Sequence, residues 1–344
     1  MFMSVAINKN NIIDSLYKIM CTGTTTAIDS RVNNNDYFKR RVRGFKAEIE
    51  FEKNILSDFQ EYKFYEGGQL WSKLLDGTRD SLNIFYYTTF DTLDPENYVP
   101  IYKKISVWSD IKKLLYIQII PEGWISEDFV AKDEEGAIDT QIIKPKFKFY
   151  EFNKELEEFS LSDTQDFDVL LSFGQDLVRA PSRFKLRRRE QFEYFNEYEL
   201  NTLIKIYSTR YFLDHKKRTK RMNMIDLDGF LYKNEELILV EIKEKTPILG
   251  STQQTASDAN YWKYGWDTRR ILWYLHLQNN LNLKTLYAIR QINNRDERAF
   301  IKWDCIMLKD FLNVTSWSSS RAGGGGEDTI TVPYNHFQDL ESIL

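Results

Sequence analysis

The segment Glu236–Lys243 (ELILVEIK) constrains the fold of this chain more than any other. It contains a continuous run of apolar residues, which is typical of a strand that is covered on both faces. The run ends in Glu241, Ile242 and Lys243, so a carboxylate and an ammonium group stand at the end of a buried strand. Because charged groups lose hydration when they are buried, charges in this place need partners or a function.

A second strand is predicted just before this one, over Met224–Tyr232, with a tight turn between the two. Since side chains alternate along a strand, Asp226 and Asp228 would lie on one face of it. Glu241 and Lys243 would share a face of the following strand by the same rule. If the strands pair as a hairpin, these groups converge at one site. The alternative interpretation is a solvated hairpin with a surface ion pair, but the apolar run is too long for an exposed hairpin.

These groups suit the hydrolysis of a phosphodiester bond. Asp228 and Glu241 would provide hard oxygen ligands for Mg²⁺, with Mn²⁺ as a substitute, and the backbone carbonyl of Ile242 would provide a third. The metal ion would polarise the phosphate and lower the pKa of a bound water. Lys243 would orient that water or stabilise the charge that develops on the phosphate. Asp226 is the alternative ligand; we favour Asp228, because the glycine after it opens the turn around the metal.

Asp228 and the Glu241-x-Lys243 triplet resemble the motif of the PD-(D/E)XK nuclease superfamily, which includes type II restriction endonucleases, Holliday junction resolvases and repair nucleases. The order of predicted elements is also similar: a helix over 191–213, the two strands, a helix over 259–279 and a further strand. The resemblance covers residues 190–310, although no proline precedes either aspartate. It implies an α/β (α+β) fold with a restriction-endonuclease-like mixed central sheet flanked by helices. It also implies that the aspartate and the glutamate bind metal and that the lysine assists hydrolysis.

Other charged side chains near these elements are weaker candidates. Three basic residues on the helix predicted over 259–279 would reach the DNA backbone: Lys263, Arg269 and Arg270. The tryptophans of that helix are expected in the core. The glutamates at positions 48, 50 and 52 lie on an earlier predicted helix. They would supply a further acidic group, with a solvated helix face as the alternative.

The chain has a net charge of -4, yet its basic residues are clustered, as is common in enzymes that bind and release DNA. The three clusters are Lys39–Lys46, Arg179–Arg189 and Lys216–Arg221. The third ends just before the predicted strand that carries the aspartates. Gln253 and Gln254, which follow the Glu-x-Lys strand, would touch DNA or form a plain polar loop. The predicted DNA contacts are Lys39, Arg40, Arg41, Arg43, Arg187, Arg188, Arg189, Lys216, Lys217, Arg218, Lys220, Gln253 and Gln254.

The sequence is long enough for two domains. We expect residues 1–165 to form an additional N-terminal α+β region for DNA recognition, and residues 170–344 to form the nuclease domain. A recognition region of this size favours a Mg²⁺-dependent, sequence-specific type II restriction endonuclease that acts on double-stranded DNA, as a homodimer if its site is palindromic. The alternatives are a structure-specific repair or recombination nuclease, like a Holliday junction resolvase, and a DNA-binding protein without catalysis.

Several other classes of protein are excluded by the same sequence. Two cysteines and three histidines, none at ligand spacing, argue against a disulfide scaffold and against a metal centre of Cys and His. No apolar run is long enough to cross a membrane, and the first residues lack the apolar core of a signal peptide. We therefore expect a soluble cytoplasmic protein.

Overall fold

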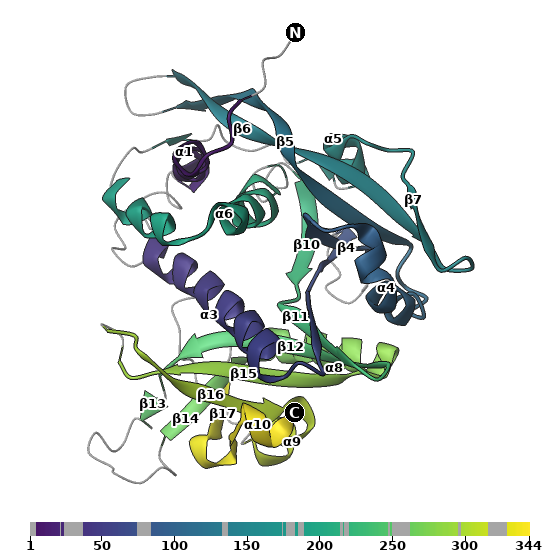
Figure 1. Cartoon of the computed structure of the whole chain (residues 1–344), viewed down its shortest axis with the longest axis vertical. Coiled ribbons are helices and arrows are strands. Elements are labelled where there is room, and N and C mark those ends of the chain that lie inside the picture. Colours follow the sequence, from purple (N-terminus) through teal and green to yellow (C-terminus); the bar gives the residue numbers. More distant parts are fainter. Residues whose placement is uncertain are drawn as a thin grey trace. The chain divides into compact units, whose positions relative to one another are not determined.

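The computed structural model describes residues 5–20, 22–23, 37–73, 84–132, 137–173, 175–176, 183–184, 189–213, 216, 220–246, 248–249, 262–294, 297–315 and 329–344. Within them the chain has the predicted mixed α+β fold, with mixed sheets flanked by helices (Figure 1). It divides into a first unit, Met1–Phe45 with Gly68–Asp226, and a second unit, Lys46–Gly67 with Leu227–Leu344. The boundary expected at 165–170 lies inside the first unit, because the chain passes between the units at 45–46, 67–68 and 226–227.

The first unit is built on one sheet, in which nine strands are described. Their order is β1-β9-β5-β4-β3-β10-β8, with β6 beside β5 and β7 beside β6. The pairing is antiparallel except for β4 with β5 and β5 with β9. The strands are β1 (Thr22–Gly23), β3 (Gln69–Lys73), β4 (Ile84–Asp91), β5 (Lys113–Lys132), β6 (Ala137–Asn153), β7 (Glu158–Leu161), β8 (Gln175–Asp176), β9 (Arg183–Phe184) and β10 (Lys220–Asp226).

Helices cover the long β5–β6 hairpin of this unit. Leu16 of α1 and Tyr207 of η4 belong to the same buried cluster as Ile117 and Ile143 of the hairpin. The hydroxyl of Tyr207 donates to the carbonyl of Ile143, which satisfies a buried polar group. The helical segments are α1 (Lys9–Met20), the start of α3 (Tyr37–Asp58), η1 (Pro95–Tyr98), α4 (Val99–Ile105), α5 (Phe167–Leu170), η2 (Leu171–Phe173), η3 (Arg189–Glu197), α6 (Leu200–Ile206) and η4 (Tyr207–Phe212).

The second unit contains a mixed sheet with strand order β18-β16-β15-β12-β11-β2 and a small sheet β13-β14-β17. Its helices are the remainder of α3, α8 (Thr268–Leu281), α9 (Leu308–Val314), η6 (Tyr334–His336) and α10 (Leu340–Ile343). Its strands are β2 (Lys63–Glu66), β11 (Gly229–Lys233), β12 (Glu236–Lys245), β13 (Ile248–Leu249), β14 (Trp262–Asp267), β15 (Lys284–Ile292), β16 (Phe300–Met307), β17 (Thr329–Pro333) and β18 (Gln338–Asp339).

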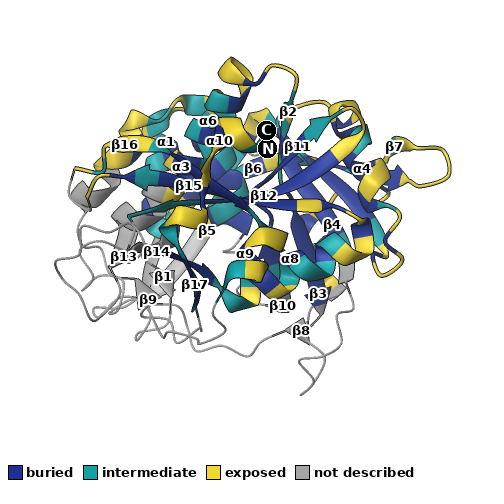
Figure 2. Cartoon of the chain, turned by 90° about the horizontal axis from the view of Figure 1, so that it is seen from below, coloured by how far each residue is buried: buried dark blue, intermediate teal, exposed yellow. Residues whose placement is uncertain are grey.

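Strand β12 is covered on both faces, as its apolar run predicts. On one face Val240 and Ile242 join the buried cluster of Phe51 from α3. On the other face, aromatic rings pack over the neighbouring β15: Tyr287 stacks on Trp266 of β14, with ring centroids 4.2 Å apart. Figure 2 shows β12 and β15 largely in the colour of buried residues. The two strands run parallel and α8 lies between them in the chain, so they form a βαβ unit.

The prediction of a single strand over Met224–Tyr232 is wrong, because this segment belongs to two strands, β10 and β11, in different sheets. Asp226, at the end of β10, pairs with Gln69 of the first unit. β11 starts at Gly229 and pairs with β2 and β12 of the second unit. The segment that pairs with both strands, residues 63–73, also passes from one sheet to the other between β2 and β3. At this point a side chain on Gly67 would collide with the backbone carbonyl of Leu227. Asp226 and Asp228 therefore do not share one face of one strand.

Two helix predictions also need correction. The helix expected over 191–213 consists of η3, α6 and η4 and belongs to the first unit, so it does not precede the active-site strands within the second unit. The helix expected from 259 begins only at Thr268, because Asp267 caps it by accepting a hydrogen bond from the backbone N–H of Arg269. Residues 262–267 pair with β17 as the strand β14 instead. None of the described helices is both long and apolar enough to span a membrane.

Candidate active site

The structure brings together Asp228, Glu241 and Lys243, the three residues predicted to act as one site. Asp228 precedes β11, and its Oδ2 accepts hydrogen bonds from the backbone N–H of Ile242 at 2.9 Å and from Nζ of Lys243 at 3.2 Å. Nζ of Lys243 also lies 2.7 Å from Oε1 of Glu241. The β11–β12 hairpin and side-chain alternation on β12 produce this convergence.

The site is deeply buried on the carboxylate side. Asp228 is 6% exposed and Glu241 is 0% exposed, whereas the side chain of Lys243 retains 35% of its exposure. Burial and the nearby Asp228 raise the pKa of Glu241, and Lys243 and Arg270 offset part of that rise. Burial lowers the pKa of Lys243, but the two carboxylates raise it further, so that its net pKa lies above the ordinary value. The ammonium group thus compensates two negative charges.

Two residues of α8 complete the site, and their role was not predicted from the sequence. The hydroxyl of Tyr274 donates to Oε2 of Glu241. One turn earlier, Nε of Arg270 lies 3.5 Å from Oε1 of Glu241, and Nη2 lies 3.7 Å from Oδ1 of Asp228. The sequence does contain a usable signal, since Arg270 and Tyr274 are four residues apart and hence face the same way on a helix. The spacing does not show that this face of the helix packs against the strand that carries Glu241, so the role was missed.

The residues present fit a divalent metal ion. Oε1 of Glu241 is buried and accepts no hydrogen bond within the described part of the chain, although two cationic groups lie near it. The carboxylates of Asp228 and Glu241 and the carbonyl of Ile242 are hard oxygen donors of the kind that Mg²⁺ prefers. The described residues contain no cluster of three or more Asp, Glu, His or Cys side chains that could hold a metal ion.

Asp226, the alternative ligand, is held by other partners. Its Oδ1 accepts a hydrogen bond of 2.6 Å from Nε2 of Gln69, and its Oδ2 pairs with Arg210 at 2.9 Å. All three residues belong to the first unit. Asp228, by contrast, contacts Ile242 and Lys243 of Glu241's own strand and shares Arg270 with Glu241, so the geometry favours Asp228 as the ligand.

The glutamate at position 50 on α3 belongs to a different cluster. Glu50 pairs with the guanidinium of Arg290, which also lies 3.0 Å from Glu244. Arg290 is only 4% exposed, so these carboxylates compensate a buried cation. Glu50 therefore has a structural role here rather than a place beside Asp228 and Glu241.

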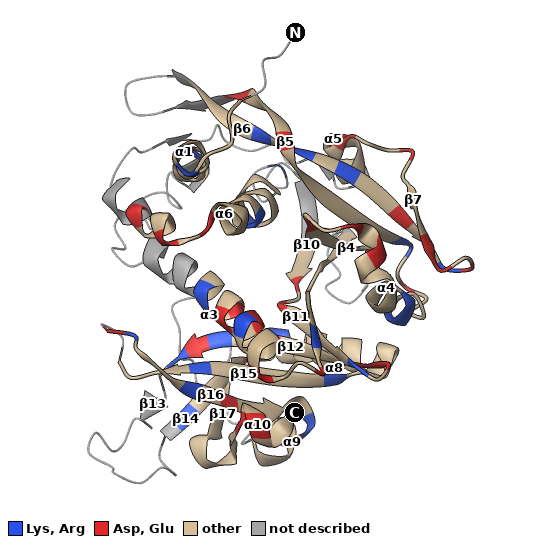
Figure 3. Cartoon of the chain, in the orientation of Figure 1, with Lys and Arg blue, Asp and Glu red and all other residues tan. Residues whose placement is uncertain are grey.

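The predicted DNA contacts are placed on several elements. The basic residues 39, 40, 41 and 43 lie on α3, Arg189 begins η3 and Lys220 begins β10. The contacts predicted at 187, 188, 217, 218, 253 and 254 lie outside the described residues. Sequence reasoning missed the lysines of β6 at positions 144, 146 and 148. Figure 3 shows basic positions along the β5–β6 hairpin. The pattern KPKFK was the available signal.

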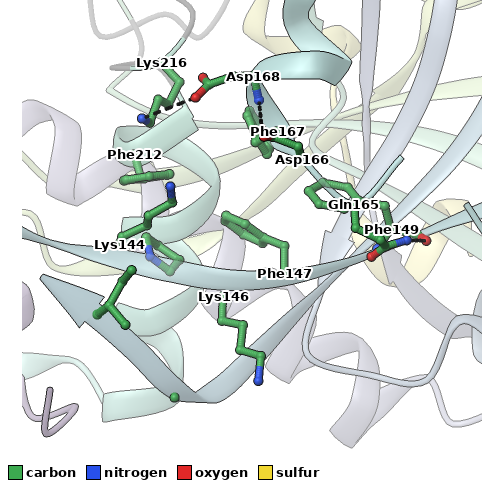
Figure 4. Close-up of a pocket in the computed structure, with 13 residues that line it drawn as sticks. Lys144, Lys146, Phe147, Phe149, Gln165, Asp166, Phe167, Asp168, Phe212 and Lys216 are labelled. Atoms are coloured by element: carbon green, nitrogen blue, oxygen red, sulfur yellow. Dashed lines mark hydrogen bonds and ion pairs between the residues drawn. The ribbon is translucent and has the colours of Figure 1, made fainter. Parts of the chain in front are cut away.

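Lys216 is engaged within the first unit. Its Nζ lies 2.7 Å from Glu127 and 5.5 Å from the ring centroid of Phe212. Burial raises the pKa of Glu127, but Lys216 and Lys144 lower it more, and the net pKa is below the ordinary value. Lys216 lines a pocket of about 320 Å³ whose wall is rich in phenylalanine, with Asp168 beside it (Figure 4). Its charge is thus already compensated by Glu127.

Comparison with known proteins adds little to this site. No family model and no curated protein matches the chain. Among solved structures, the chain is similar to Hjc, a Holliday junction resolvase from the archaeal hyperthermophile Archaeoglobus fulgidus, with 8% sequence identity and a TM-score of 0.21. The match covers 34% of this chain and 71% of the resolvase chain. The case for a function therefore rests on the side chains of the second unit.

Proposed function

We propose that this protein is a metal-dependent endonuclease of the PD-(D/E)XK type that hydrolyses phosphodiester bonds of double-stranded DNA. The observation that carries the proposal is the convergence of two buried carboxylates, Asp228 and Glu241, on the ammonium group of Lys243. Buried charges of this kind are costly, and a hairpin stabilised by packing alone has no use for them. Oxygen donors beside an amine are what phosphodiester hydrolysis needs.

Each residue has a role in this proposal. Asp228, Glu241 and the carbonyl of Ile242 would hold Mg²⁺ or Mn²⁺, and the ion supplies Lewis acidity and an acidified water when bound. The side chain of Lys243 keeps 35% of its exposure, and its ammonium group would orient the water or stabilise charge on the phosphate. Tyr274 holds one oxygen of Glu241, so the other oxygen keeps a fixed direction.

We further propose that the first unit recognises DNA and that the protein is a type II restriction endonuclease. Support comes from the size of this unit and from its positive charge, on the start of α3 and along β6. Base reading needs elements beyond those that contact phosphates. A palindromic site would be read by a homodimer, in which two copies place their active sites on opposite strands.

Incubation of the purified protein with a long plasmid and Mg²⁺ tests the function. Discrete fragments are expected from sequence-specific cleavage, and Glu241→Gln and Lys243→Ala should each abolish them, because residues that act as a unit cause large losses singly. Glu236→Gln, at an exposed position on the same strand, is the matched control and should cleave normally.

Two further outcomes would change the proposal. If the protein cleaves only branched DNA, it is a structure-specific nuclease and not a restriction enzyme. If every DNA substrate stays intact, or if cleavage is complete in excess EDTA, the proposal of a metal-dependent endonuclease is wrong.

A further inference from the structure

The carboxylate pair of the site is matched by two cations without any metal ion. Asp228 and Glu241 together carry two negative charges, and Lys243 and Arg270 carry two positive charges within 4 Å of them. The cluster is therefore neutral as a whole. Because breaking up a buried ion pair leaves an uncompensated charge, this neutrality stabilises the metal-free fold.

Arg270 occupies a distinct position in this cluster. It lies near the start of α8 and bridges the carboxylates, with its Nε 3.5 Å from Glu241 and its Nη2 3.7 Å from Asp228. These separations are longer than the 2.7 Å between Lys243 and Glu241. Oε1 of Glu241, the atom nearest to Nε of Arg270, is also the buried oxygen that accepts no hydrogen bond within the described residues. The guanidinium thus lies beside the oxygen that best fits a metal ion.

We propose that Arg270 is a built-in counter-cation of the Asp228–Glu241 pair, which weakens divalent metal binding in free protein and couples it to DNA binding. The inference rests on the proposed function. A guanidinium stays charged at any pH at which the protein is folded, so its repulsion of a metal ion is not relieved by proton loss. A divalent ion added to the neutral cluster leaves two excess positive charges.

A DNA phosphate at the exposed side of the site would offset part of that excess. Metal would then bind more tightly when DNA is present, and by reciprocity DNA would bind more tightly when metal is present. Lys243 does not serve as this coupling group alone, because it donates hydrogen bonds to Asp228 and to the carbonyl of Ile242 and is thereby fixed. Arg270 comes from another element, α8, and adds a second positive charge beside both carboxylates.

Titration with Mn²⁺ in the absence of DNA, followed by electron paramagnetic resonance, tests the competition. Arg270→Gln should bind Mn²⁺ at least about fivefold more tightly than the wild type, at the low end of typical coupling between sites. Arg270→Lys keeps the charge and should stay near the wild-type affinity. Arg269→Gln, at the exposed neighbouring position, is the matched control and should equal the wild type.

The coupling itself is measured with Ca²⁺ in place of Mg²⁺, so that DNA is bound without being cut. We expect the ratio of DNA affinities with and without Ca²⁺ to be several-fold smaller in Arg270→Gln than in the wild type and in Arg269→Gln. If metal-free Arg270→Gln is too unstable to be titrated, thermal unfolding replaces the titration. Saturating Mn²⁺ should then raise the melting temperature of the variant by more than it raises that of the wild type.

The outcomes separate the two proposals. If Glu241→Gln binds Mn²⁺ as well as the wild type, and Arg270→Gln shows no added affinity, the metal centre and the inference both fail. If Mn²⁺ binding depends on Glu241 but is equal in the wild type, Arg269→Gln and Arg270→Gln, the proposed function stands and the inference is overturned. The inference is also overturned if the ratio of DNA affinities with and without Ca²⁺ is the same in Arg270→Gln as in the wild type.

Discussion

The phenolic hydroxyl of Tyr274 donates a hydrogen bond to Oε2 of Glu241, a carboxylate that is 0% exposed. This contact ties α8 to β12 and fixes the orientation of the carboxylate, whose other oxygen faces Lys243. Burial, and then the charge of Glu241, raises the pKa of Tyr274 well above its ordinary value, so the hydroxyl keeps the proton that it donates. Tyr274 is therefore a positioning residue for the site.

The first prediction concerns this contact. Tyr274→Phe leaves a buried charged oxygen without its donor, so we expect a loss of about 1–3 kcal/mol in the free energy of unfolding. Cleavage should fall about tenfold or more, since the carboxylate is no longer held in one orientation. Urea unfolding and single-turnover cleavage measure the two effects. Tyr287→Phe, which removes a bond of 2.9 Å to the neutral carbonyl of Gly265, is the control and should retain cleavage.

The second prediction separates the two aspartates. Asp228→Asn should abolish cleavage and Mn²⁺ binding, because its carboxylate belongs to the cluster of Glu241 and Lys243. Asp226→Asn should keep Mn²⁺ binding and lose some stability, since it breaks the ion pair with Arg210. Metal titration and thermal unfolding of both variants provide the measurements. Loss of metal binding in Asp226→Asn alone would reverse the assignment.

The sequence predicts the buried strands of the second unit correctly, but it does not predict where the chain enters that unit. The apolar run before Glu241 correctly indicates a strand buried on both faces, because burial on both sides removes the polar alternation. The break at Leu227–Asp228 is not predictable from local pattern, since it depends on pairing with residues 63–73, far away in the chain. Propensity reports what a segment favours by itself, while long-range pairing selects the sheet.

The candidate site shows the same division. Asp228, Glu241 and Lys243 are close in sequence, so the hairpin alone brings them together. Arg270 and Tyr274 reach the carboxylates because α8, which is distant from β11 and β12 in the chain, packs against the site. The helix start was misplaced because the aromatic segment before the cap has no strand alternation that stands out from a helical stripe. The contacts of Arg270 and Tyr274 were missed because they depend on how the helix packs against the sheet, which the local pattern does not reveal.

The third prediction concerns the pH dependence of stability. Burial, and next the charge of Lys243, lowers the pKa of Lys245 to about 8, and its ammonium donates to the carbonyl of Gly265. The unfolded value is about 10.4, so between about pH 8 and 10.4 only the unfolded chain holds this proton. The cost of burying the charge is full below pH 8 and is relieved as pH rises toward 10.4.

Lys245→Met removes that cost. We expect the variant to gain on the order of 2 kcal/mol at pH 7, less whatever the lost hydrogen bond contributed, and to lose this advantage by about pH 10. Denaturant unfolding of both proteins from pH 7 to 10 measures the difference. Parallel curves for the two proteins would show that Lys245 does not titrate in this range.

The fourth prediction concerns the DNA surface of the first unit. Lys146 and Lys148 are exposed on β6, whereas the charge of Lys216 is compensated by Glu127 at 2.7 Å. If the two exposed lysines neutralise phosphates, replacing both with Ala should reduce the slope of log K against log salt by about 0.9 for each contact. Lys216→Ala should change this slope less, because its ammonium would have to leave Glu127 to reach a phosphate. DNA titrations across a salt series with Ca²⁺ measure these slopes. A larger effect of Lys216→Ala than of the double variant would move the DNA contact from Lys146 and Lys148 to Lys216, whose place is drawn in Figure 4.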